Sequence, residues 1–216
     1  MSRAPHSMAS ALSASARTAI HTMALATLML AGLAGCALGP TASDPVGYDF
    51  KPAPAKAGEA KMRQAVLVPD VVGPIWMDTP AIFYRLAYRD AARPQAYSGS
   101  RWVMPPAILF TNRLRQKVAA ASSGGVVAPS DGIRAPYTLR LEIEDFSQVF
   151  ESESKSHAAL RLRASVLNSR SLVAQKSFSV DVSAARPDAD SGVRALTAAS
   201  EQAMDQVIDW AAGHIR

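Results

Sequence analysis

The chain contains a single cysteine among its 216 residues, and aromatic residues make up only 6% of it. Because a disulfide needs two cysteines, no internal disulfide can stabilise the fold. No apolar run approaches the roughly 20 residues that a transmembrane helix requires. The fold must therefore depend on an ordinary hydrophobic core, and the chain is long enough to bury one.

The excess of positive charge is also small, with a formal net charge of +5. Arg3 and Arg17 are the only charged residues among residues 1–35, so the rest of the chain carries a net charge of +3. An excess this weak on a domain of this size gives no reason to predict nucleic-acid binding.

Patterns that carry catalysis are missing from the sequence. His157 and His214 lie far apart and lack the paired spacing of metal ligands. There is no Gly-x-Ser-x-Gly motif and no glycine-rich phosphate loop. Glu142 and Glu144 alternate with apolar residues, which is typical of the solvated face of a strand rather than of a catalytic pair. We predict that the protein is not an enzyme and uses no metal or cofactor.

The N-terminal segment has the parts of a bacterial export signal. A basic flank precedes a short apolar run at residues 23–33, and Leu33-Ala34-Gly35-Cys36 follows. This tetrapeptide resembles the bacterial lipobox, in which the cysteine sulfur receives a diacylglycerol before cleavage. The alternative is an ordinary signal peptide that happens to end beside a cysteine. We predict a signal peptide over residues 1–35 and lipidation of Cys36.

The predicted lipid has consequences for location. A cysteine lipidated by this route carries three acyl chains, and two or more chains hold a protein stably on a membrane. Ala37 stands where an inner-membrane retention signal would have aspartate, so we predict the outer membrane, with the domain facing the periplasm. Residues 36–61 are rich in Pro and Ala and are predicted to be a tether, within which Tyr48-Asp49-Phe50 could form a short first strand.

Residues 62–216 are predicted to form one α+β domain. Apolar and polar residues alternate over 137–144, 160–166 and 177–182, which predicts three strands joined as an antiparallel meander. Residues 65–68 and 82–88 are rich in strand-forming residues and predict two earlier strands, with a turn over 93–99.

Two helices complete the predicted fold. Pro105-Pro106 is typical of a helix start, and apolar residues then recur at helical spacing until Ser122-Ser123-Gly124-Gly125. Pro187-Asp188 opens a terminal helix with a mostly apolar stripe. The members of the stripe are Val193, Leu196, Ser200, Ala203, Val207, Trp210 and His214. The order β-β-α-β-β-β-α predicts one curved, mainly antiparallel sheet covered by two helices.

The few aromatic residues are concentrated around the second predicted strand. Five of these aromatic and methionine side chains are candidates for a partner interface: Trp76, Met77, Tyr84, Tyr88 and Trp102. Aromatic and methionine side chains are enriched at interfaces, but the same residues also pack cores. Both interpretations remain open at the level of sequence.

Several segments together resemble one family. Pro74–Arg85, Tyr97–Pro106, Leu141–Phe146 and Tyr48–Phe50 are similar, in order and spacing, to the ABC-transporter auxiliary lipoproteins of the PqiC/YmbA-like family. The resemblance runs from Cys36 to the terminal helix.

The resemblance implies a docking or scaffold subunit of an envelope lipid transport system. Its implied partners are a periplasmic MCE-domain protein and an ABC permease and ATPase, and a homo-oligomer is a further expectation. The family has no catalytic residues to carry over. A structural lipoprotein that assists another envelope machine is the alternative, because a small tethered α+β domain suits that role equally well.

Overall fold

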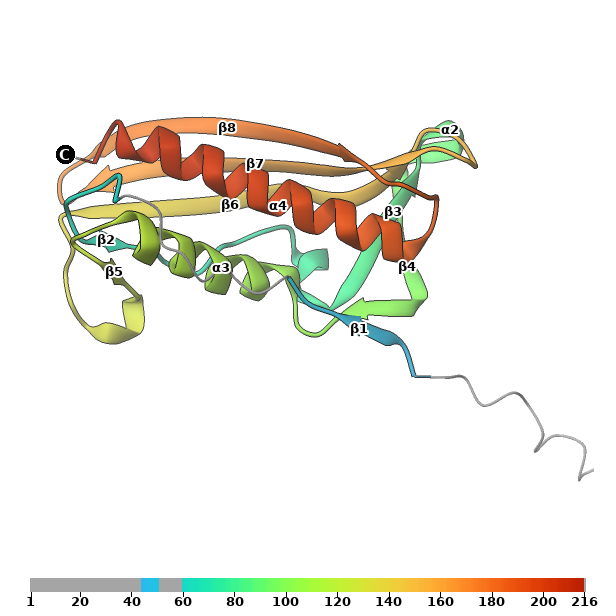
Figure 1. The fold of residues 1–216 in the computed structure, drawn as a ribbon, viewed down its shortest axis with the longest axis horizontal. Coiled ribbons are helices and arrows are strands. Elements are labelled where there is room, and N and C mark those ends of the chain that lie inside the picture. Colours follow the sequence, from blue (N-terminus) through green and yellow to red (C-terminus); the bar gives the residue numbers. More distant parts are fainter. Residues whose placement is uncertain (1–43, 51–59, 216) are drawn as a thin grey trace, which may run out of the picture. The chain divides into compact units, whose positions relative to one another are not determined.

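The computed structural model describes residues 44–50 and 60–215 (Figure 1). The strands are β1 (Val46–Tyr48), β2 (Val66–Leu67), β3 (Ala81–Leu86), β4 (Ala91–Trp102), β5 (Val126–Val127), β6 (Tyr137–Phe150), β7 (Ser156–Asn168) and β8 (Leu172–Ser183). The helices are α2 (Ala87–Asp90), α3 (Pro106–Ala121) and α4 (Ala189–Ala212), with 3-10 turns η2 (Ile75–Asp78) and η3 (Pro129–Asp131).

β6 is the strand on which the sheet is built. One of its edges pairs antiparallel with β7 along the whole strand, and β7 pairs antiparallel with β8. The other edge is shared, because β2 pairs parallel with the start of β6 and β3 pairs parallel with its end. The predicted meander is therefore confirmed.

Two short arms extend from the shared edge of β6. β2 carries β5 in parallel, whereas β3 carries β4 antiparallel and β4 carries β1 in parallel. The described strands thus form one open, mixed sheet of eight strands. Its long pairings are antiparallel and its short ones mostly parallel, and together with the helices they confirm the predicted α+β class.

A bulge in β6 keeps both of its halves packed on the core. Leu139, Leu141 and Ile143 are buried, and the register then shifts between Ile143 and Asp145. Because strand side chains alternate between the two faces, one extra residue exchanges the faces. Phe146 and the side chains at alternate positions after it consequently remain on the buried side.

Both long helices lie on one face of the sheet, as Figure 1 shows. The carboxylate of Asp188 accepts a hydrogen bond of 2.7 Å from the backbone N–H of Ser191 and so caps α4. The hydrogen bond from Arg186, and then that from the Ser191 N–H, lower the pKa of Asp188 to about 2. The predicted stripe is buried from Val193 to Val207, whereas Trp210 is half-buried against Phe178.

The segment between β3 and α3 differs from the prediction. The turn predicted over residues 93–99 is wrong, because β4 continues through it. Pro94 suggests a turn by sequence, but proline is tolerated on an edge strand, and among the described residues β4 pairs with β1 only at Ser100–Trp102. The chain reverses earlier, in α2, which includes the end of the predicted strand 82–88.

Phe50 attaches the N-terminal segment to the core. Its side chain is 7% exposed, and its ring makes edge-to-face contacts with Trp102, Phe110 and Phe146 at centroid distances of 5.6, 5.3 and 6.4 Å. The described part of the chain accordingly begins a single unit at Asp44. Residues 44–50 thus lie in the domain rather than in a tether that extends to residue 61.

This packing generates the first prediction. Phe50→Ala removes a buried aromatic ring from a site that neighbouring rings cannot fill, so we expect the free energy of unfolding to fall by about 3–5 kcal/mol. Chemical denaturation measures the change. Ile133→Ala is the control, because Ile133 is 63% exposed and its loss should have almost no effect. An equal stability for Phe50→Ala and the wild type would show that residues 44–50 do not belong to the core.

An ion-pair network joins α3 to α4. The largely buried guanidinium of Arg113 donates from Nη2 to Glu201 over 2.9 Å, and Lys117 donates to the same carboxylate over 2.9 Å. Burial by itself would raise the pKa of Glu201, but the hydrogen bonds from Arg113 and Lys117 outweigh it, and the pKa lies below its ordinary value. The folded state therefore favours the ionised carboxylate.

The second prediction follows from the sign of this shift. A carboxyl group with a lowered pKa stabilises the fold above its unfolded-state pKa, and this contribution is lost as the pH falls through the folded-state pKa. We expect Glu201→Gln to lose about 1–3 kcal/mol at neutral pH, and the difference from wild type to shrink on acidification. Denaturation of both proteins over a pH series measures it. A difference that is independent of pH would contradict the electrostatic origin.

Candidate functional site

The predicted interface residues do not form one surface. Met77 and Trp102 are each 1% exposed, and Trp102 stacks on Phe146 at 5.7 Å between ring centroids. Met77 lies in η2 with its sulfur against Gly73. In this domain both side chains are part of the core, so the interpretation as interface residues does not hold for them. The competing interpretation as core residues applies, because neighbouring side chains leave almost none of their surface accessible to solvent.

The other three predicted residues lie in separate places. Trp76 is half-buried against Phe83, with ring centroids 4.8 Å apart. Tyr84 is the next residue along β3 and faces the other way, since neighbouring strand residues point to opposite faces. Its ring packs on Tyr97 at 4.6 Å. Tyr88 is in α2 and is 39% exposed. A partner role for these three residues stays a prediction.

Tyr97 belongs to a buried polar network where β4, β6, β7 and α4 meet. Its hydroxyl donates to the Oε1 atom of Gln148 over 2.9 Å, and the Nε2 atom of Gln148 donates to Ser156 over 2.8 Å. Gln148 is fully buried, and a Cβ on Gly192 would lie 1.9 Å from its Oε1 atom. Burial raises the pKa of Tyr97 above its usual range, so the hydroxyl remains a donor. The network fixes the start of α4 against the sheet.

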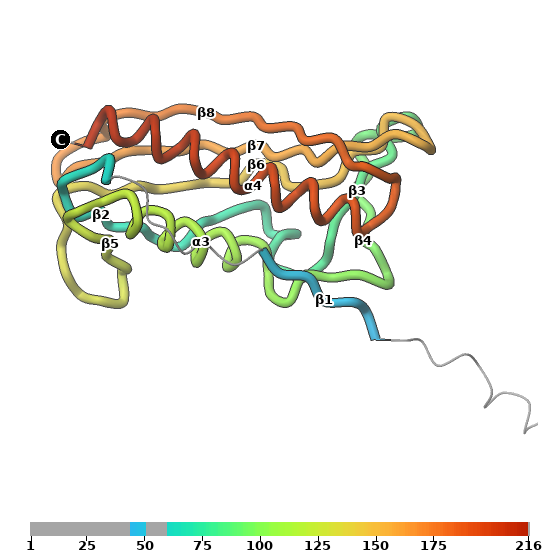
Figure 2. Tube along the Cα trace, in the orientation of Figure 1, coloured from blue at the N-terminus to red at the C-terminus, as the bar shows by residue number. Residues whose placement is uncertain are grey.

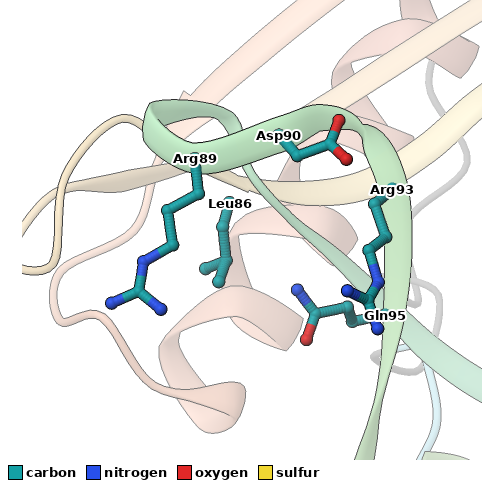
Figure 3. Close-up of a pocket in the computed structure, with 5 residues that line it drawn as sticks. All are labelled: Leu86, Arg89, Asp90, Arg93 and Gln95. Atoms are coloured by element: carbon teal, nitrogen blue, oxygen red, sulfur yellow. The ribbon is translucent and has the colours of Figure 1, made fainter.

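A pocket of about 210 Å³ opens beside this end of the sheet. It is lined by Leu86 at the end of β3, Arg89 and Asp90 in α2, and Arg93 and Gln95 in β4 (Figure 3). Sequence reasoning missed it, because the segment was interpreted as a strand followed by a turn. The sequence signal for this pocket was the presence of two arginines, Arg89 and Arg93, on the two sides of the short connection between β3 and β4.

The β6–β7 turn lies beside the same connection, as the trace in Figure 2 shows. The guanidinium of Arg89 is 3.4 Å from the carboxylate of Glu153 in that turn. In the same turn, Glu151 accepts a hydrogen bond from Lys155, which is the main reason that its pKa lies below the ordinary value. His157 also approaches Glu151, with 2.9 Å between Nδ1 and Oε1.

The sheet face opposite the helices carries ion pairs. Arg161 and Asp181 form two hydrogen bonds, of 2.7 and 3.0 Å, between β7 and β8. Arg163 lies 3.1 Å from Glu142 and 3.6 Å from Glu144. Both glutamates are nearly half exposed, which agrees with the predicted solvated face.

Metal and membrane sites can be judged for residues 44–50 and 60–215 alone. No group of three or more His, Cys, Asp or Glu residues in these ranges is arranged to hold a metal ion. No helix in the same ranges has the length and apolar character to cross a membrane. The predicted lipidation site, Cys36, lies outside the described residues.

The chain belongs to the family of ABC-type transport auxiliary lipoprotein components, whose model matches residues 48–208. The resemblance inferred from the sequence is therefore confirmed. Membership implies a membrane-anchored protein that assists a transport system, and the family is not a class of enzymes.

Solved structures share the fold. A protein of the DUF330 family from Xanthomonas campestris superposes with a TM-score of 0.63 at 20% identity, over 79% of this chain and 94% of that one. An uncharacterised protein gives a TM-score of 0.59 at 12% identity, over 78% of this chain and 99% of the other. At these identities the likeness shows the fold alone. Among curated proteins, none matches this sequence.

The third prediction separates core from surface aromatics. Trp102→Ala should lower the free energy of unfolding by about 3–5 kcal/mol, because it leaves a cavity among stacked rings. Tyr88→Ala should change it by less than about 0.5 kcal/mol, since Tyr88 lies in an exposed turn. Thermal melts of the two variants measure both. If Tyr88→Ala is the more damaging change, this assignment of core and surface is wrong.

Proposed function

We propose that the protein is the outer-membrane lipoprotein subunit of an ABC/MCE-type envelope lipid transport system, where it acts as a docking or scaffold component. The observation that carries this proposal is the family match over residues 48–208 in a chain that has its one cysteine in a lipobox-like sequence. The domain supplies a binding surface rather than catalysis. Its proposed partners are a periplasmic MCE-domain protein, an ABC permease and ATPase, and further copies of the chain.

The proposed anchor would limit how such a subunit is placed. If Cys36 carries the lipid, only residues 36–43 separate it from the domain, which begins at Asp44. Eight residues span at most about 29 Å when fully extended. The domain would therefore remain close to its own membrane, and partners anchored elsewhere would have to reach it there.

The fourth prediction tests the anchor. Cys36→Ala should abolish metabolic labelling by fatty acid and release the protein from the membrane fraction, because no acyl chain then holds it. Ala37→Asp is the matched control. It keeps the cysteine and should stay labelled, but it should move from the outer to the inner membrane. Persistence of Cys36→Ala on membranes after a high-salt wash would contradict the proposed anchor.

Capture of partners tests the transport role. The lipidated wild type, isolated from its native envelope in mild detergent, should retain the MCE-domain protein. Recovery of the components of a different envelope machine, without the MCE protein or permease, would favour the structural alternative. The two outcomes are distinguished by mass spectrometry of the captured proteins.

A further inference from the structure

The pocket between β3, α2 and β4 is basic and preformed, and we propose that it binds the phosphate group of an anionic phospholipid headgroup. Arg89 and Arg93 line it from the two sides of the connection, with Leu86 and the amide of Gln95 between them (Figure 3). Drug-sized ligands usually occupy about 300–1,000 Å³. The 210 Å³ available here suits a single small headgroup.

The positive charge of the pocket is only partly balanced. Within the described residues, no acidic side chain forms an ion pair with Arg93. The pair between Arg89 and Glu153 is 3.4 Å long, with both side chains more than 60% exposed, and pairs of this kind are weak and easily exchanged. Guanidinium groups donate paired N–H bonds that match the geometry of phosphate oxygens. A phosphate in the pocket could therefore accept hydrogen bonds from two guanidinium groups, with only the weak Arg89–Glu153 pair competing for them.

Asp90 lines the same pocket, but it has a structural role. Its Oδ1 atom accepts a hydrogen bond of 3.0 Å from the backbone N–H of Ala92. In Figure 3 its carboxylate points away from the side of the connection on which the Arg89 side chain lies. The residues that line the pocket therefore carry two guanidinium groups and one carboxylate, and the second carboxylate nearby, that of Glu153, is held only by the weak pair with Arg89.

The connection is held in shape from the other side of β3. The Nη1 atom of Arg85 donates to the carbonyl oxygens of Ala91 and Ala92, at 3.3 and 3.4 Å. Leu86 and Asp90 also form a backbone bridge. A loop fixed in this way loses little conformational freedom when a ligand binds, so less of the binding energy is lost to ordering.

The choice of a lipid as the source of the phosphate rests on the proposed function. α2 and β1 both lie at the end of the domain away from the C-terminus (Figure 1), and the short segment to Cys36 leaves from β1. Tyr88 is 39% exposed, with the Arg89 guanidinium 5.4 Å from its ring centroid. A tyrosine beside arginines suits a membrane–water interface, where one part of the side chain is apolar and the other is wet.

The test uses residues 36–216, the chain that remains after removal of the predicted signal peptide, with Cys36→Ser, so that neither an attached lipid nor the signal peptide holds it on vesicles. Its binding to phosphatidylcholine vesicles with and without phosphatidylglycerol is measured by sedimentation, and its binding to soluble glycerophosphoglycerol by calorimetry. Arg89→Gln and Arg93→Gln should each weaken both interactions about fivefold, the effect expected for one basic residue at an anionic surface. Arg140→Gln, an exposed arginine of β6, is the matched control and should have no effect.

Each outcome decides a different point. Loss of both interactions in the two pocket variants, but not in Arg140→Gln, supports the headgroup site. Loss of glycerophosphoglycerol binding without a change on vesicles overturns the lipid source and identifies a site for small soluble phosphates. Equal binding by all variants overturns the site. Failure of the site would leave fatty-acid labelling of Cys36 and partner capture unchanged, so the proposed function is tested separately.

Discussion

The insertion of Phe50 between Trp102, Phe110 and Phe146 is the contact on which the arrangement of this protein depends. It joins β1 to the core through the end of β4, the first turns of α3 and the middle of β6. Without it, the segment before residue 60 would be a long spacer, and the distance of the domain from its membrane would be free. With it, the domain begins at Asp44, and a lipid on Cys36 would be separated from the domain by residues 36–43 alone.

The edge of β6 that β2 and β3 share determines where the pocket and the Tyr97 network lie. β2 and β3 divide this edge, so the chain between them crosses the middle of the strand, where Val72 bridges to Glu142. β3 therefore pairs with the last residues of β6, beside the β6–β7 turn. The basic pocket, the Tyr97 network and the start of α4 all lie at this end of the sheet. The ion pairs between α3 and α4 instead connect the two helices near their middles.

The parts of the fold with a clear period were predictable. The alternation of Leu139, Leu141 and Ile143 and the caps at Pro105 and Asp188 predict the elements that the structure shows. The short first strand suggested at Tyr48–Phe50 lies two residues earlier, as β1 at Val46–Tyr48, and β5 has only two residues, too few for any period. Both form where a neighbouring strand edge is available. Pro94 favours a turn by sequence, and for this reason residues 93–99 were predicted as a turn although they belong to β4.

The site was less predictable than the fold. An aromatic side chain has the same identity in a core and at an interface, so sequence could not show that Met77 and Trp102 are buried while Tyr88 is exposed. Likewise, the pocket exists because α2 reverses the chain and brings Arg89 and Arg93 to one place, which no local pattern reports. The functional class was predictable from the family resemblance, because that resemblance depends on the order of several segments rather than on a single site.

We propose that a short lipidated segment holds the domain close to its membrane. This separation can be measured as a distance, because lipidation of Cys36 would consume the chain's one natural thiol and leave an introduced cysteine free for labelling. A fluorescent donor at Asp44→Cys and acceptors in the lipid headgroups of the native membrane would report the separation. We predict that residue 44 lies within about 29 Å of the membrane surface. A separation clearly beyond that limit would contradict an anchor at Cys36.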